Sequence, residues 1–395
     1  MIPAGQGFTL ATACRLLLLA AVAAHGCSGK VSEQQRRLTG ELVLAAVAAN
    51  TAEVDRLIAV GADVNGEAGF GTPLEAVVDR GNVDMIRHLV GKGARIGWYN
   101  PPLPIRAIKA DRDEALLALL DLGAAADCRA DGFTPLAIAV SRGRPELVRA
   151  LLERKANPRP FRGFGVPQQR TTLLHLAASS GDLETFTIVA RLFPDLKLVD
   201  GCGRNALHAV CGIVGSGNDR AVILERLLAA GVDPHARMND KQVNDLWEAA
   251  IETPLQAAAA NGWWDLVAIL VDKVGHTPAE LTAALPLAVR NEVPVPTIER
   301  MIAAGADLNA AGPFPPTLHI AIERGSPAMV SALLAAGADA TRANARGEDA
   351  LALARIRAAR GRKVPVGGVP YHGESKDAPD AGQRILELVS EHGAR

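Results

Sequence analysis

Aromatic side chains are scarce in this chain of 395 residues, which has 8 Phe, 4 Trp and 2 Tyr. So few large side chains argue against one thick hydrophobic core. A disordered chain is excluded as well, because 49% of the residues are hydrophobic. Alanine, leucine and glycine dominate the apolar content, and this composition favours many thin packed layers.

An excess of either charge is also absent, since 42 Lys and Arg stand against 43 Asp and Glu. There is therefore no electrostatic basis for nucleic-acid binding. The 5 cysteines are too few for a disulfide scaffold, and Cys128, Cys202 and Cys211 are an odd number beyond the N-terminal region. If a disulfide forms, we expect Cys202 with Cys211, but three unpaired thiols in alanine-rich packing is the favoured interpretation.

Long hydrophobic runs are missing too. The longest lies near the N-terminus, where nine apolar residues, Leu16 to Ala24, follow Arg15. A bilayer needs roughly 20 such residues, so the run predicts a secretory signal peptide and not a membrane span.

The sequence that follows, Ala24-His25-Gly26-Cys27, resembles the lipobox of bacterial lipoproteins. That resemblance implies a signal peptide at 1–26, a lipidated Cys27 and a linker at 27–38. Ser28 after the cysteine implies the outer membrane, facing the periplasm. The alternatives are an uncleaved signal anchor, or an ordinary secretory signal that leaves a soluble periplasmic protein.

The rest of the chain is repetitive. The segments 72-TPLEAVVDRG-81, 134-TPLAIAVSRG-143 and 253-TPLQAAAANG-262 share one pattern. The residues that close successive units lie 32, 30, 32, 76, 74 and 32 apart, which indicates a period near 32 with two gaps of double length. The closing residues are Gly61, Gly93, Gly123, Lys155, Gly231, Gly305 and Gly337.

Each unit is predicted to be a helix, a turn and a second helix. Thr134 can cap the first helix, with Pro135 at its first position and Gly143 ending it in a left-handed conformation. Leu147, Val148, Leu151 and Leu152 would form the buried stripe of the second helix. Two short helices cannot bury their stripes alone, so the units must stack into a solenoid.

This pattern resembles the ankyrin repeat family. The resemblance implies an all-α repeat solenoid over 39–395, made of about ten stacked helix-turn-helix repeats with β-hairpin loops at one edge. The last repeat is degenerate and carries a Gly- and Pro-rich insertion at 358–383, which we expect to be flexible. Repeat boundaries are least clear in 277–307, which contains four prolines. Two loops, Lys155 to Thr172 and Gly231 to Thr253, are longer than the regular ones.

No set of residues in the sequence makes a convincing catalytic or metal site, and no cofactor is expected. His175, His208 and His319 recur at the fourth position of the repeat start, where the family's histidine bonds to the backbone of the adjoining hairpin. Cys202, His208 and Cys211 form a closer set. Packing is the favoured role for it, and a metal or redox site is a remote alternative.

The charged residues that end the first helices, such as Asp79, Arg142 and Arg324, are expected to be solvated or to face a partner in the groove. Aromatic and arginine side chains usually dominate binding energy. The candidate partner-binding residues therefore lie in or beside the hairpin segments: Trp98, Tyr99, Phe133, Phe161, Arg162, Phe164, Arg170 and Trp247.

Together these features predict a non-catalytic protein-binding scaffold or adaptor, held in the bacterial cell envelope by a lipid on Cys27 and bound to another envelope protein. The alternative is an immunity-type inhibitor that covers a toxin or hydrolase.

Overall fold

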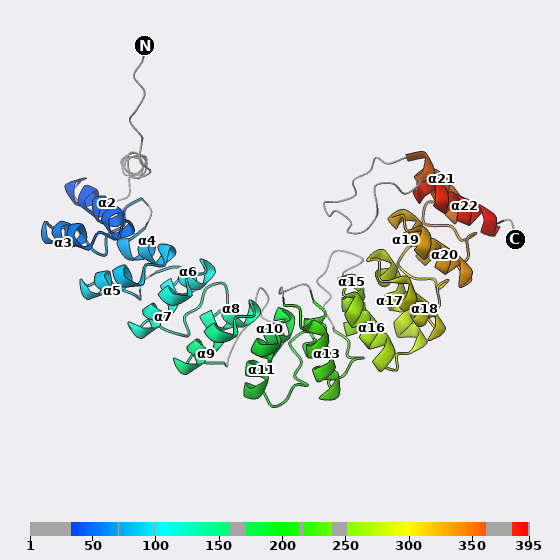
Figure 1. The fold of residues 1–395 in the computed structure, drawn as a ribbon, viewed down its shortest axis with the longest axis horizontal. Helices are drawn as coiled ribbons and strands as arrows, with labels where there is room; N and C mark the ends of the chain where they lie inside the picture. Colours follow the sequence, from blue (N-terminus) through cyan, green and yellow to red (C-terminus); the bar gives the residue numbers. More distant parts are fainter. Residues whose placement is uncertain are drawn as a thin grey trace, which may run out of the picture. The chain divides into compact units, whose positions relative to one another are not determined.

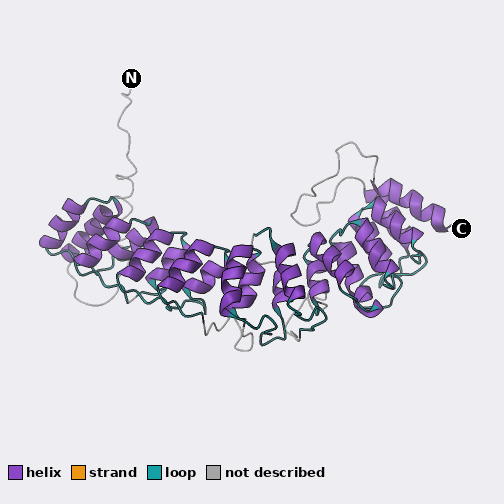
Figure 2. Ribbon diagram, turned by 60° about the horizontal axis from the view of Figure 1, so that its bottom comes forward, coloured by secondary structure: helices purple, strands orange, loops and turns teal. Residues whose placement is uncertain are grey.

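The computed structural model describes residues 33–69, 71–97, 99–158, 171–212, 217–238, 251–360 and 381–393. These residues form helices joined by turns and loops, without a strand (Figure 2). The predicted all-α repeat solenoid is confirmed. In place of the predicted β-hairpins, the described loops are rich in turns, and one isolated bridge joins Ala130 to Phe133.

The helices follow one another as pairs within two compact units, Met1–Pro167 and Gln168–Arg395 (Figure 1). In the first unit the helices are α2 (Glu33–Val47), α3 (Thr51–Ala59), α4 (Pro73–Arg80), α5 (Val83–Gly91), α6 (Leu103–Lys109), α7 (Asp113–Asp121), α8 (Pro135–Ser141) and α9 (Pro145–Glu153). The first helices α2, α4, α6 and α8 pack in one layer, and α5, α7 and α9 pack in a second layer.

The second unit repeats this two-layer arrangement. Its helices are α10 (Leu173–Ser180), α11 (Leu183–Leu192), α12 (Ala206–Val210), α13 (Arg220–Ala229), α15 (Pro254–Ala260), α16 (Trp264–Lys273), α17 (Pro278–Arg290), α18 (Val295–Ala303), α19 (Thr317–Arg324), α20 (Pro327–Ala335), α21 (Ala350–Arg360) and α22 (Ala381–Gly393). Each first helix packs against the next first helix, from α10 and α12 through to α21.

Local sequence explains where the helices begin and end. The hydroxyl of Thr134 accepts a hydrogen bond from the Ala137 N–H, and Pro135 opens α8. Thr72 and Thr253 form full capping boxes with Glu75 and Gln256. Gly143 follows α8 with a φ of 63°, as predicted for the helix stop.

The core between the layers is made of small and medium side chains. Leu136 and Val140 of α8 and Val148 and Leu151 of α9 are almost fully buried, whereas Leu152 is only half-buried. The predicted stripe of the second helix therefore lacks one of its four members.

Helix α17 departs from the repeat pattern. Only 4 residues separate Lys273 from Pro278, whereas 13 separate the corresponding helices α7 and α8. Glu292, with a φ of 57°, ends α17 as Gly262, with a φ of 68°, ends α15. In the repeat of α15, the capping residue Thr253 lies nine residues before Gly262. Counting nine residues back from Glu292, the matching position in the repeat of α17, gives Ala283 as the expected capping residue.

Thr277 does begin a helix as the sequence predicts, but it begins six residues before the repeat register requires. A capping box between Thr277 and Glu280 starts the helix early, in a segment that forms a loop elsewhere. Pro286 consequently lies inside α17. The loop of this repeat is thus replaced by extra helical turns.

Neighbouring repeats are tied by side chains that donate to backbone carbonyls. The carbonyls lie in the last turn of a first helix or directly after it, where the regular donor four residues further along the helix is missing. The donors lie near the end of the next first helix. The bonds are Arg112 to Asp79, Arg142 to Ile108, Asn261 to Cys211, Asn291 to Ala259, Arg324 to Arg290 and Arg357 to Glu323.

Charges at these helix ends are therefore partnered inside the stack. The carboxylate of Asp79 accepts bonds of 2.6 and 2.7 Å from Arg106, and Arg144 pairs with Asp113 at 2.7 Å. Because Arg142 and Arg324 also bond to the preceding repeat, the prediction that such charges are simply solvated is wrong for them.

Among the described bonds from a side chain to a backbone carbonyl of another repeat, those of Arg220 in α13 are the most buried. Its guanidinium donates to the Val210 carbonyl at 2.6 Å and to the Ser179 carbonyl at 2.8 Å, and it lies 4.5 Å from the centroid of the Trp263 ring. The residue is only 3% exposed. One side chain thus contacts three successive helix pairs.

Replacing Arg220 with alanine should lower the free energy of unfolding by about 3 kcal/mol, because two buried carbonyls lose their donor. Urea titration followed by circular dichroism measures the loss. Arg226→Ala is the matched control on α13, because the Arg226 guanidinium donates to the Thr187 hydroxyl in an exposed bond and to no buried carbonyl of the described residues. A surface change of this kind should alter the free energy of unfolding by no more than about 0.5 kcal/mol. Equal losses in the two variants would contradict the role given to Arg220.

Candidate functional site

Two of the three recurring histidines serve the fold. The Nε2 atoms of His175 and His208 lie 2.9 Å from the Arg204 carbonyl and 3.0 Å from the Glu252 carbonyl, in the adjoining loops. The role that the sequence predicts for these two side chains is confirmed. His319 is fully buried, and neither ring nitrogen has a hydrogen-bond partner of normal geometry.

Cys202, His208 and Cys211 do not converge on a shared ligand position. All three cysteines of the repeat region are free thiols. Burial raises the pKa of Cys211 to about 12 and that of Cys128 to about 11, so neither thiol forms a reactive thiolate near neutral pH. These observations give no support to a redox or metal site at Cys202, His208 and Cys211.

Two predicted partner-binding residues lie within the described residues. The phenol of Tyr99 is half-buried, and it accepts a hydrogen bond of 3.3 Å from the Thr72 hydroxyl. Burial raises the pKa of Tyr99. Phe133 is also half-buried, beside its bridge to Ala130. The remaining candidates fall outside the described ranges: Cys27, Trp98, Phe161, Arg162, Phe164, Arg170 and Trp247.

Trp263 and Trp264 connect three repeats. Trp263 donates from Nε1 to the Gly212 carbonyl at 3.0 Å, toward the preceding pair. Trp264 donates to the Asn291 carbonyl at 3.3 Å, toward the following pair, and is 49% exposed. Trp264 is therefore the large aromatic side chain that α16 presents to solvent.

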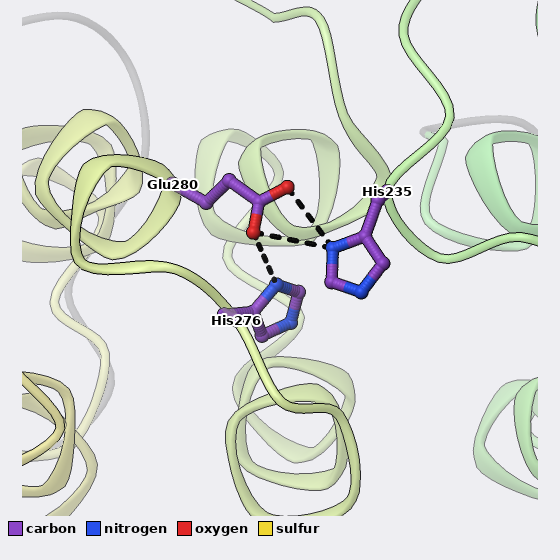
Figure 3. Close-up of side chains that lie close together, drawn as sticks. All are labelled: His235, His276 and Glu280. Carbon is purple, nitrogen blue, oxygen red and sulfur yellow. Dashed lines mark hydrogen bonds and ion pairs between the residues drawn. The ribbon is translucent and has the colours of Figure 1, made fainter.

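A cluster that the sequence did not predict lies close to α16. Among the residues that the structure describes, His235, His276 and Glu280 offer one ligand atom each within 4.8 Å of one another. The Nδ1 atom of His235 lies 3.0 and 3.1 Å from the two carboxylate oxygens of Glu280. The Nδ1 atom of His276 lies 3.6 Å from Oε2 of the same carboxylate, so both imidazoles point toward it (Figure 3).

The early start of α17 creates this cluster. His235 lies in the loop after α13, and His276 directly precedes the helix cap Thr277. Glu280 occupies the third position of α17, where the Thr277 N–H and hydroxyl donate to its Oε2 atom at 2.9 and 3.2 Å. The capping box thereby fixes the carboxylate against the loop that carries His235.

The local electrostatics keep the carboxylate charged and the buried imidazole neutral. Burial raises the pKa of Glu280, but hydrogen bonds from Thr277 and His235 outweigh this and lower it overall. Burial lowers the pKa of His276. The His276 side chain is 2% exposed, and neither ring nitrogen has a hydrogen-bond partner of normal geometry.

An open pocket of about 720 Å³ lies beside the cluster. The residues before His235 and His276, Pro234 and Gly275, line it. Lys273 and Glu225, which also line it, are joined at 2.6 Å.

Sequence reasoning missed the cluster because His235 precedes His276 by 41 residues. Regular repeats of this register would place a loop where α17 begins. The sequence His276-Thr-Pro-Ala-Glu280 was the available signal, since a capping box draws Glu280 back toward the residues before the helix.

Comparison with protein-family models finds a match to part of the chain. Residues 105–200 match the family model for ankyrin repeats, in three copies. Ankyrin repeats indicate a protein-interaction scaffold, and helix pairs of the same kind continue on both sides of the matched segment.

Curated proteins give no significant match to the chain. Among solved structures, the chain is similar to the human ASB11 ankyrin repeat domain, with 19% identity and a TM-score of 0.44. That alignment covers 65% of this chain and 98% of the human domain.

The buried histidines should make the repeats sensitive to acid. Burial lowers the pKa of His208 to about 4, against an ordinary value of about 6.5 in the unfolded chain. Between these values the unfolded chain binds the extra proton, so stability falls as the pH falls. The stability advantage of the wild type over His208→Gln should shrink by about 2 kcal/mol between pH 7.5 and 4.5.

Urea titrations of the wild type and of His208→Gln at the two pH values measure this difference. Carboxylates present in both proteins contribute equally to the two stabilities, so their titration cancels in the comparison. His88→Gln is the control, since His88 is bonded to the Asp55 carboxylate at 2.7 Å. An advantage independent of pH would show that His208 is not held neutral by the fold.

Proposed function

We propose that this chain is a non-catalytic protein-binding scaffold of the bacterial cell envelope, tethered by a lipid on Cys27. The observation that supports binding most strongly is the set of side-chain ties between consecutive repeats. They hold the ends of consecutive first helices in a defined register within each unit. A surface organised in this way before binding loses little conformational entropy when a partner docks.

The tether is supported by the sequence of the N-terminal region, Arg15 through Cys27, which resembles a lipoprotein signal. None of the described helices is both long enough and apolar enough to cross a membrane. A lipid chain added to Cys27 would supply the membrane affinity, with the polar residues up to 38 acting as a spacer.

The partner is proposed to be another envelope protein. The long loop that begins after Gly231 closes where the Met238 N–H donates to the Glu252 carbonyl at 2.8 Å. The sequence has about 11 more residues between Gly231 and Thr253 than a regular repeat has, and an insertion on a base closed by this bond suits recognition of a partner. An immunity-type inhibitor uses the same surface, and the identity of the captured partner distinguishes it from a scaffold.

Lipidation is tested by producing the full chain in bacteria that are fed an alkyne-tagged fatty acid. The wild type should carry the label and fractionate with membranes, and Cys27→Ala should lose the label and become soluble. Cys128→Ala, a change at a half-buried thiol, should keep both properties. A label that persists in Cys27→Ala would contradict the proposed anchor.

Partner binding is tested first by cross-linking the tagged chain in envelope fractions and identifying the protein captured. Affinity is then measured with the purified partner. Replacing Phe161 and Phe164 together with alanine should weaken binding by about 2 kcal/mol or more, roughly 30-fold, because aromatic anchors dominate interfaces.

The control for this pair is Val60→Ala, at an apolar side chain that is 53% exposed at the end of α3. It should leave the affinity unchanged. Unchanged affinity in the double phenylalanine variant as well would remove the loop 159–170 from the binding surface. A captured toxin or hydrolase that loses activity in the complex would establish the inhibitor role.

A further inference from the structure

The cluster of His235, His276 and Glu280 is not needed for stacking. In α15 the corresponding side chain, the amide of Gln256, bonds only at the helix start, and in α4 the Glu75 carboxylate also pairs with Arg106 at 3.1 Å. In α17 the corresponding side chain, Glu280, also faces two imidazoles, one of them from a loop two helix pairs upstream. This convergence occurs at the point where α17 replaces a loop.

The distances from the carboxylate to the two imidazoles suit ligands of one ion, and all three ligand atoms lie within 4.8 Å of one another. A tetrahedral ion with ligands at about 2.0 to 2.1 Å has edges of about 3.3 to 3.4 Å between those ligands. Glu280 Oε2 lies 3.1 Å from His235 Nδ1 and 3.6 Å from His276 Nδ1, on either side of that edge length. The two rings stand nearly perpendicular at 74°, with centroids 5.3 Å apart.

The surroundings also suit a cation. His276 is buried with both ring nitrogens lacking a hydrogen-bond partner of normal geometry, which is unfavourable for an imidazole unless a ligand completes it. The Thr277 N–H and hydroxyl hold the Glu280 carboxylate in place, as the ligating carboxylates of metal centres are held. His235 is 40% exposed and gives an ion a route from solvent.

We propose that His235, His276 and Glu280 bind one divalent transition-metal ion of the Zn²⁺ class. Two imidazoles and one carboxylate match the preference of Zn²⁺ for nitrogen and oxygen ligands. The ion replaces the hydrogen bonds of His235 to Glu280 and joins the loop after α13 to the start of α17. Its fourth position is left for water or for a donor group of a bound partner.

The test uses the full chain, purified without a histidine tag and stripped with a chelator. Zn²⁺ is added, and its affinity is measured by competition with a chromogenic chelator and its content by mass spectrometry. We expect one Zn²⁺ per chain. His235→Ala and Glu280→Gln should each weaken affinity at least about 100-fold, the upper end of the loss seen when an outer-shell partner is removed.

Both variants are chosen to keep the fold. His235 is partly exposed, and glutamine preserves the cap of α17 because Gln256 already forms the same capping box in α15. Their melting temperatures without metal should stay close to that of the metal-free wild type, because the bond they alter is partly exposed. Only the wild type should gain thermal stability on adding Zn²⁺.

His88→Ala is the matched control, because His88 also bonds to a carboxylate, Asp55, but belongs to no described cluster of three ligands. It should bind Zn²⁺ as the wild type does. Co²⁺ in place of Zn²⁺ should give the intense visible absorption of a tetrahedral site, absent in His235→Ala. Zn²⁺ affinity that is the same in the wild type and in both cluster variants would overturn the proposal, as would no binding to the wild type.

Discussion

The carbonyl groups at the ends of the first helices are the constraint on which the stack depends. A helix of seven or eight residues leaves half of its carbonyls without an internal donor, so it is incomplete alone. Here the next repeat supplies the donor, from Arg112, Arg142, Asn261, Asn291, Arg324 or Arg357. Burial of the leucine stripes brings the pairs together, and these bonds set how one pair sits on the next.

Much of the fold could be predicted from the sequence because its determinants are local. The Thr-Pro start of α8, the glycine after it and the stripe of α9 each act within one repeat. The register of α17 could not be read in the same way, since Thr277 carries every local sign of a repeat start and the shift is visible only at Glu292. The helix-end arginines were misread because their acceptors belong to another repeat.

The site was less accessible to sequence reasoning. His175 and His208 could be assigned because each occupies a recurring position. His235 and His276 occupy none, and their approach depends on a loop being replaced by helix. The general lesson is that departures from a repeat bring together residues that the period alone keeps apart, so they are the places to search for chemistry.

Arg220 has a consequence for how the second unit unfolds. A stack in which each repeat touches only its neighbours behaves as a one-dimensional Ising chain, with one coupling energy per interface. Arg220 belongs to the pair of α12 and α13 and contacts both adjacent pairs, at Ser179 of α10 and at Trp263 beside α16, so one side chain contributes to two successive interfaces. The energies of these two interfaces are therefore not independent: fraying that displaces Arg220 from one side also weakens the interface on the other side.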